Sequence, residues 1–304
     1  SLKPMLRQNG LTIIDSYEDL SESQRSYVDQ YFQQDVYPVL TPMAVDSSRP
    51  FPLIRNKSLN IGALISDKED ESEYDFATVQ VPSVLPRFIE IPSGEKGHKT
   101  LILLEQVIEM NIQNLFLNYK VICAYPYRIM RNADLSIDEE DAADLLKEIQ
   151  KQLKRRQWGE VIRLEVEDGI DKRLLKILKK AMNVGEASIY RINGPLDLTF
   201  LMKVNGLDGY DHLKYPKYEP QLSKDIHPDE DLFTQIRGKD ILLFHPFQSF
   251  DTVVDFVRQA AKDPDVLAIK QTLYRVSGNS PIIASLAEAA ENGKQVTVLV
   301  ELKA

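Results

Sequence analysis

The segment YRVSGNSP, residues 274–281, groups residue types that are suited to binding an anion. Arg275 supplies a guanidinium group, which can donate two parallel hydrogen bonds to a carboxylate or a phosphate. Ser280 precedes Pro281, a residue favoured at the first position of a helix, and the free N–H groups of a helix start attract negative charge. A serine before a proline is also an ordinary N-cap, and an arginine is also a common surface residue. The segment therefore predicts either a phosphate site or a plain helix start.

His245, in the run LLFHPFQSF, is a second candidate for chemistry. It follows an apolar stretch, where a nucleophile or a general base could stand at a strand end. No Asp or Glu lies close to it in the sequence to orient its ring, so we expect it to make a local hydrogen bond rather than to catalyse. Ser249 and Asp251 are expected to be the N-cap and the first-turn acid of the following helix.

Metal and nucleotide motifs are weak or absent. The four histidines lack metal-ligand spacing, and the single cysteine, Cys123, sits in an apolar stretch where a core position is expected. The acidic run DKEDESEYD at 67–75 is expected to be a solvated hairpin loop rather than a metal site. Neither G-x-x-x-x-G-K-[ST] nor G-x-G-x-x-G occurs, which argues against an unrelated nucleotide-binding α/β protein.

The last third of the chain alternates strand and helix patterns. Strands are expected at 239–244, 266–274 and 295–301, and helices at 249–262 and 281–292. This βαβαβ order predicts a parallel sheet with right-handed crossovers. Ligands bind beyond the carboxyl ends of such strands, and this is where Arg275 and His245 would lie.

The first two thirds predict a mixed domain and a linker. A capping box at Ser21 and Gln24 starts a helix expected over 21–36. The other expected elements are strands at 59–65, 76–81, 100–104, 120–130, 161–166 and 187–192, and helices at about 105–117, 138–156 and 170–182. The segment 209–231, rich in Pro, Tyr and charge, is expected to be a linker. Two basic stretches, 147–158 and 171–180, predict solvated helix faces or, alternatively, a phosphate-binding surface.

The whole-chain composition limits the partners. A length of 304 residues predicts about two domains. The net charge of -9 argues against general binding to nucleic acid or to anionic membranes. No run is apolar enough to span a membrane, and the start lacks the apolar core of a signal peptide. We therefore expect a cytoplasmic protein.

Several runs resemble the long, multi-domain type of bacterial polyphosphate kinase. They are YFQQDVYPVLTPMAVD, FPLIRNKSLNI, VPSVLPRFIEIP and the stretch from LLFHPFQSFDTVVDF to the last residues, VLVELKA. The resemblance implies an enzyme that reversibly transfers the terminal phosphate of ATP to inorganic polyphosphate through a phosphohistidine, with Mg²⁺ as cofactor. It also implies a homo-oligomer, a dimer or a tetramer, in the cytoplasm with or without peripheral membrane association.

The resemblance assigns a place to each part of the chain. Residues 1–14 correspond to the tail of a helical N-terminal domain, 15–221 to an α+β head domain, and 222–304 to part of a first catalytic α/β domain of the phospholipase D-like type. Arg275 matches an arginine at the phosphates of Mg-ATP, as a neighbour of the metal, and no carboxylate ligand of the metal is identified. The acceptor histidine is expected beyond residue 304, so no catalytic residue is expected here and the chain alone is expected to be inactive. The alternative is a non-catalytic dimerisation or polyphosphate-binding module.

Overall fold

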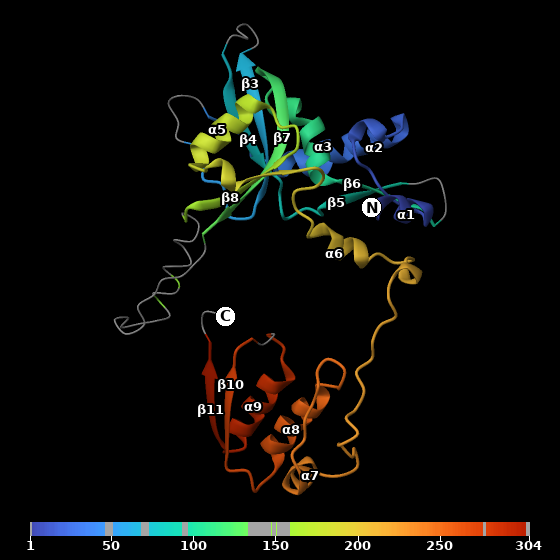
Figure 1. The fold of residues 1–304 in the computed structure, drawn as a ribbon, viewed down its shortest axis with the longest axis vertical. Helices are drawn as coiled ribbons and strands as arrows, with labels where there is room; N and C mark the ends of the chain where they lie inside the picture. The colour runs from blue at the N-terminus through green and yellow to red at the C-terminus, as the bar shows by residue number, and fades with distance from the viewer. Residues whose placement is uncertain are drawn as a thin grey trace. The chain divides into compact units, whose positions relative to one another are not determined.

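A computed structural model describes residues 2–45, 51–67, 73–92, 97–132, 147, 150, 159–275 and 278–301. The described residues form two compact units: residues 2–132 and 150–213 make up the first, and residues 214–301 together with Lys147 make up the second. Each unit has its own sheet and its own apolar core (Figure 1). Most of the basic stretch at 147–158 and part of the acidic run at 67–75 lie outside the described residues.

A six-stranded mixed sheet organises the first unit. Its order is β2 (Met43–Val45), β4 (Asp75–Gln80), β3 (Leu59–Asp67), β7 (Tyr119–Arg131), β8 (Val161–Glu167) and β9 (Ile189–Ile192). All neighbouring pairs are antiparallel except β8 and β9, which are parallel. The expected strands of this sheet are confirmed within a few residues, and β3 and β4 form the expected hairpin.

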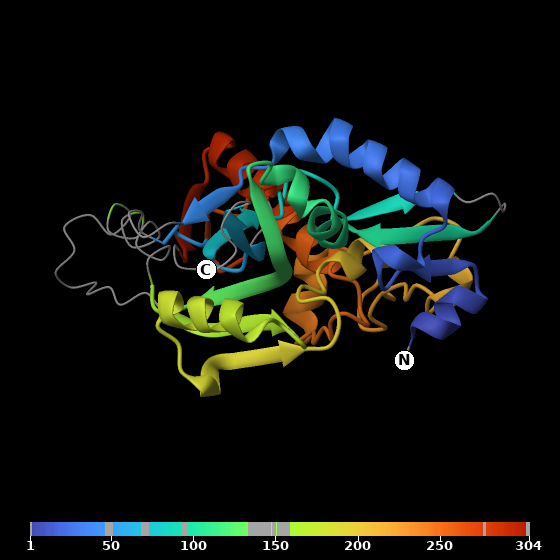
Figure 2. The same cartoon turned by 90° about the horizontal axis from the view of Figure 1, so that it is seen from above.

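Helices cover both faces of this sheet. Alternate residues of β3 face opposite sides: Ile61 and Ile65 join one apolar cluster, whereas Leu64 joins another. The first cluster includes residues of α2 (Glu22–Tyr31) and α3 (Leu104–Met110), and the second includes one side of α5 (Lys172–Met182). Seen from above, α2 and α5 lie on opposite sides of β7 (Figure 2). The sheet is thus buried on both faces, which explains why β3 is apolar over most of its length.

The capping box predicted at the start of α2 is present. The Ser21 hydroxyl accepts from the Gln24 N–H, and the Gln24 side chain accepts from the Ser21 N–H at 3.0 Å. The helix then widens into a π-helical turn, Phe32–Val36, and closes with a 3₁₀ turn, Tyr37–Val39. Pro38 lacks the N–H that a continuing helix would need, which accounts for the stop.

A smaller sheet in the first unit was not expected. Its order is β1 (Leu11–Ile13), β6 (Lys99–Leu103) and β5 (Phe88–Ile91), and it packs with α1 (Lys3–Gln8) and α6 (Phe200–Asn205). Only β6 was predicted. Strands of three or four residues carry too few positions for a period-two pattern to stand out.

The second unit is a βαβ arrangement preceded by two helices. Its elements are α7 (Leu232–Gly238), α8 (Asp251–Lys262), β10 (Ala268–Leu273), α9 (Pro281–Glu291) and β11 (Gln295–Val300). β10 and β11 are parallel, with Ala268 opposite Gln295. The expected elements from residue 249 onward are confirmed. The helix α7 was not predicted; it lies between the expected linker, residues 209–231, and the expected strand at 239–244.

The prediction of a first strand at 239–244 in the βαβαβ pattern is wrong. Residues 240–244 form no strand, and the side chain of Leu242 is 83% exposed. A strand needs a hydrogen-bonded neighbour, and among the described residues β10 pairs with β11 alone. The Phe244 N–H donates instead to the Gln248 side chain at 2.6 Å. The apolar run is therefore an extended segment that ends in a turn.

The expected linker is mostly irregular. It contains one 3₁₀ turn, Asp211–Leu213, and an isolated parallel bridge between Gln221 and Gln248.

Throughout the described ranges, every helix falls short of the length and apolar character that a bilayer crossing requires.

Candidate functional site

Arg275 lies just beyond the carboxyl end of β10, as the strand pattern predicted. The strand ends at Leu273, and the exposed Arg275 side chain places its guanidinium carbon 5.6 Å from the centre of the Tyr274 ring. In the chain, α9 connects β10 to its parallel neighbour β11. The exposed guanidinium can therefore reach an anion arriving from solvent.

In the described part of the chain, no side chain caps the start of α9. Ser280 is the N-cap residue and Pro281 follows it, but the Ser280 side chain makes no capping hydrogen bond. No acidic residue occurs in the first turn. The helix dipole and the free N–H groups favour an anion at this position. The Ser280 side chain thus does not act as the ordinary N-cap that the sequence left open, and an anion site at this position stays a prediction.

His245 is held in a local turn. Its Nδ1 lies 2.9 Å from the carbonyl oxygen of Gln248, and its ring meets Phe250 edge to face at 5.3 Å. A ring nitrogen that donates to a backbone carbonyl fixes the orientation of the ring. This arrangement agrees with the expected local hydrogen bond.

The predicted cap of α8 is displaced by one residue. Phe250 occupies the N-cap position, while the Ser249 hydroxyl accepts from the Asp251 N–H at 3.1 Å and donates to the Asp251 carboxylate at 2.8 Å. Asp251 is in the first helical turn, as expected. A short serine turn therefore stands in place of a standard cap.

The basic stretch at 171–180 is an amphipathic helix with partly neutralised charge. Arg173 pairs with Asp171 at 2.7 Å, and Lys179 pairs with Glu186. The bond from Arg173 lowers the pKa of Asp171 to about 2. Leu174 and its apolar neighbours one turn apart pack into the core. The arrangement agrees with the solvated-face alternative for this stretch.

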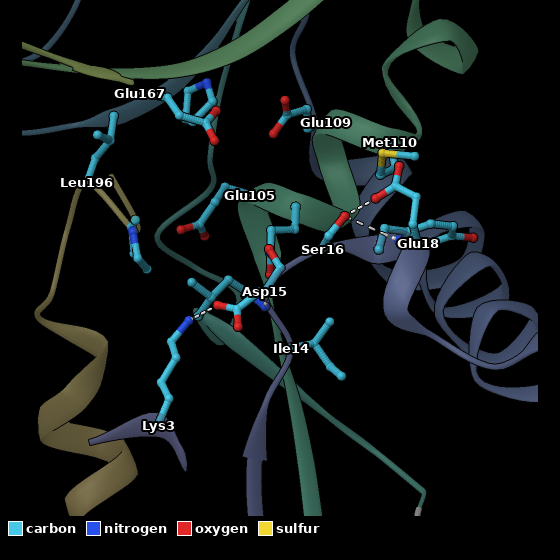
Figure 3. A pocket seen from close by; sticks show the side chains of 16 residues that line it. Lys3, Ile14, Asp15, Ser16, Glu18, Glu105, Glu109, Met110, Glu167 and Leu196 are labelled. Carbon is cyan, nitrogen blue, oxygen red and sulfur yellow. Dashed lines mark hydrogen bonds and ion pairs between the residues drawn. The ribbon is translucent and has the colours of Figure 1, made fainter. Parts of the chain in front are cut away.

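A carboxylate-lined pocket in the first unit was missed by the sequence analysis. It measures about 310 Å³ and is lined by Glu18, by Glu105 and Glu109 of α3, and by Glu167 at the end of β8 (Figure 3). Glu105 and Glu109 are one helical turn apart, but the other two carboxylates come from distant segments. Only the folded chain brings the four together, so no sequence spacing could have revealed them.

The pocket raises the pKa of Glu109. Burial is the largest cause, and the carboxylates of Glu167, Glu105 and Glu18 add to it, so that the pKa rises to about 8. Burial also raises the pKa of Glu167. Within the described ranges, no group of three or more His, Cys, Asp or Glu side chains could hold a metal ion. The raised pKa favours the protonated form of the Glu109 carboxyl group near neutral pH.

The free energy of unfolding should depend on pH through Glu109. The folded state keeps a proton that the unfolded chain releases above its ordinary pKa of 4.5. This contribution to stability is complete below about pH 4.5 and is lost as the pH rises toward about 8. Replacing Glu109→Gln removes the loss, so the variant should be more stable than the parent at pH 9 by about 1–3 kcal/mol.

Urea unfolding followed by circular dichroism at pH 5 and pH 9 measures this effect. The exposed Glu219→Gln is the matched control and should leave the pH dependence as it is in the parent. An equal pH dependence in the parent and in Glu109→Gln would show that Glu109 ionises normally in the folded state.

Comparison with known proteins gives the family. The sequence profile described as "Polyphosphate kinase middle domain" matches residues 23–204, and "Polyphosphate kinase C-terminal domain 1" matches residues 231–304. The polyphosphate kinase of Halalkalibacterium halodurans is 51% identical over 304 residues, which cover 99% of this chain and 43% of that protein. The polyphosphate kinase of Streptomyces coelicolor is 42% identical over 307 residues, which cover 99% of this chain and 40% of that protein.

A solved structure agrees with the sequence matches. The crystal structure of polyphosphate kinase from Porphyromonas gingivalis superposes with a TM-score of 0.80 at 27% identity, covering all of this chain and 44% of that one. The chain thus spans less than half the length of these three relatives. With matching profiles over both units and the same mixed α/β sheets, the chain belongs to the polyphosphate kinase family.

Proposed function

We propose that this chain is part of a longer polyphosphate kinase, which reversibly transfers the terminal phosphate of ATP to inorganic polyphosphate through a phosphohistidine. The observation that carries the proposal is the 51% identity to a polyphosphate kinase along nearly the whole chain. Residues 222–304, which make up most of the second unit, are proposed to be part of the first catalytic domain, of the phospholipase D-like type, and residues 15–221 to be the head domain.

Arg275 is the phosphate-binding residue of this proposal. Its exposed guanidinium at the carboxyl end of β10, next to the uncapped start of α9, supports this role. A guanidinium at this place neutralises charge on the phosphoryl group of ATP or ADP while that group moves. The acceptor histidine belongs to a part of the enzyme other than this chain, so the 304 residues alone bind without catalysing.

The proposed cofactor is Mg²⁺. It shields the charge of the phosphates when it is bound, and its usual ligands are one or two carboxylates together with phosphate oxygens and water. The residues described here supply no cluster of metal ligands, and Arg275 is a neighbour of the metal rather than a ligand. The enzyme is further proposed to be a cytoplasmic homo-oligomer, a dimer or a tetramer.

Synthesis of ATP from ADP and polyphosphate tests the proposed function. The longer protein that contains these residues is mixed with ADP, Mg²⁺ and polyphosphate, and ATP is read by luciferase luminescence. ATP should accumulate only when ADP, polyphosphate and protein are all present. Absence of ATP with a folded, full-length protein would reject the proposed reaction.

A further inference from the structure

A second pocket, separate from the carboxylate-lined one, opens at one end of the six-stranded sheet. It measures about 410 Å³. Three stretches of the first unit line it: residues 55–59, which lead into β3; residues 80–87, which follow β4; and residues 197–203, which lead into α6. β3 starts and β4 ends at this edge because the two strands are antiparallel.

The pocket carries an excess of positive charge. Arg55, Lys57 and Lys203 are exposed cations that line it, and none of the three forms an ion pair with a carboxylate in the part of the chain that the structure describes. The lining also includes Arg87 and one carboxylate, Asp197, which pair with each other at 3.3 Å. Among the described residues, these three cations have no counter-charge, although the chain as a whole carries a net charge of -9.

Asp197 remains ionised and bound to its own partners. Burial opposes its ionisation, but hydrogen bonds from Thr199 and the nearby charges of Arg128 and Arg87 outweigh burial and lower its pKa. Its carboxylate is thus occupied within the protein and does not neutralise Arg55, Lys57 or Lys203.

The turn that presents Arg55 and Lys57 is firmly anchored. Lys57 has a left-handed backbone, with φ of 61°, and its carbonyl oxygen accepts from Arg128 at 3.2 Å. The Asn56 side chain accepts from the Arg131 N–H at 2.9 Å. The Ser58 hydroxyl donates to the Arg55 carbonyl at 2.8 Å. A turn fixed at each residue presents its cations with little loss of backbone freedom on binding.

The lining favours an inorganic ligand over a nucleotide. Phe200 is the aromatic residue among the lining residues, and it is buried, with the Arg87 guanidinium 5.9 Å above its ring. No ring is left exposed there for a base to stack on, and stacking is the usual way in which proteins hold bases. The guanidinium of Arg55 and the ammonium groups of Lys57 and Lys203, on two separate stretches, are suited instead to a ligand with several phosphoryl charges.

We infer that this pocket binds a run of several phosphoryl groups of an inorganic polyphosphate chain. The identification of the ligand as inorganic polyphosphate rests on the proposed function, whereas the preference for an oligoanion rests on the unpaired cations. The pocket lies wholly in the first unit, so this site is separate in sequence from Arg275.

Isothermal titration of the 304-residue chain with tripolyphosphate at low salt tests the inference. The double variant Arg55→Gln with Lys203→Gln should weaken binding by about tenfold or more, because two charge-assisted contacts are lost. The matched control, Lys176→Gln with Lys180→Gln, removes two exposed cations from α5 and should stay within about twofold of the parent. Circular dichroism checks that all three proteins are folded.

Each outcome decides the inference. Binding that weakens in the pocket variant, is retained in the control and falls with added salt supports it. No binding, equal binding of orthophosphate, or a loss only in the α5 variant would overturn it. The titration contains no ADP and no transfer step. The luciferase assay can show no ATP while the pocket variant binds tripolyphosphate more weakly than the parent. In that case the proposed reaction is rejected, but the inference that the pocket binds an oligoanion is kept.

Discussion

Replacing Arg275→Ala in the longer protein should lower the rate of phosphate transfer by about a thousandfold or more, the scale of losing an arginine that stabilises a moving phosphoryl group. Charge builds on the phosphate oxygens as the phosphoryl group moves, and a guanidinium placed beforehand stabilises that charge without reorganisation. Because the contact is strongest in the transition state, kcat should fall more than KM for ATP rises.

Two further variants sharpen this prediction. Arg275→Lys keeps the charge but loses the planar fork, so its rate should lie between those of the parent and of Arg275→Ala. Arg258→Ala is the control, because Arg258 is an exposed arginine of α8 that pairs with Asp255 within its own helix. Steady-state rates of ATP formation measure all three. A rate close to that of the parent in Arg275→Ala would remove Arg275 from the phosphate site.

Replacing Arg87→Met should destabilise the first unit by about 3–5 kcal/mol. Arg87 donates through Nε and a terminal nitrogen to the two oxygens of Glu105, at 2.7 and 2.6 Å, and also pairs with Asp197. The Glu105 side chain is only 6% exposed. Without the arginine, a buried carboxylate next to Glu109 loses its partner, and its ionised form becomes costly.

The double variant Arg87→Met with Glu105→Met distinguishes the loss of the whole ion pair from the cost of leaving the Glu105 carboxylate buried without its partner. It should be less destabilised than Arg87→Met, because no uncompensated charge is left behind. Urea unfolding of the two variants and of the parent at pH 7 gives the comparison. If Arg87→Met unfolds at the same urea concentration as the parent, the bidentate contact contributes nothing to stability.

The sequence predicted those parts of the fold that depend on neighbours along the chain. The capping box at Ser21, the amphipathic helix over 170–182 and the alternation of strand and helix after residue 249 are local patterns, and each is present. The place of Arg275 also followed from a local fact, since a residue after a parallel strand must lie at its carboxyl edge.

The remaining features depend on partners that are distant in sequence. Residues 240–244 have the composition of a strand but no neighbouring strand to pair with, so propensity alone misled the prediction. The carboxylate pocket and the basic pocket are each assembled from several separate stretches. The raised pKa of Glu109 in the first pocket depends on burial, and the positive charge of the second depends on cations without an acidic partner. Neither property can be read from the order of residues along the chain.

Transfer of label from γ-labelled ATP tests the central claim most directly. The 304-residue chain and the longer protein are each incubated with labelled ATP, Mg²⁺ and a polyphosphate primer, and label is scored in the polymer and as an acid-labile bond on protein. The longer protein should label both, and the 304-residue chain should label neither. Transfer by the 304-residue chain itself, or a longer protein that labels no polymer, would contradict the account.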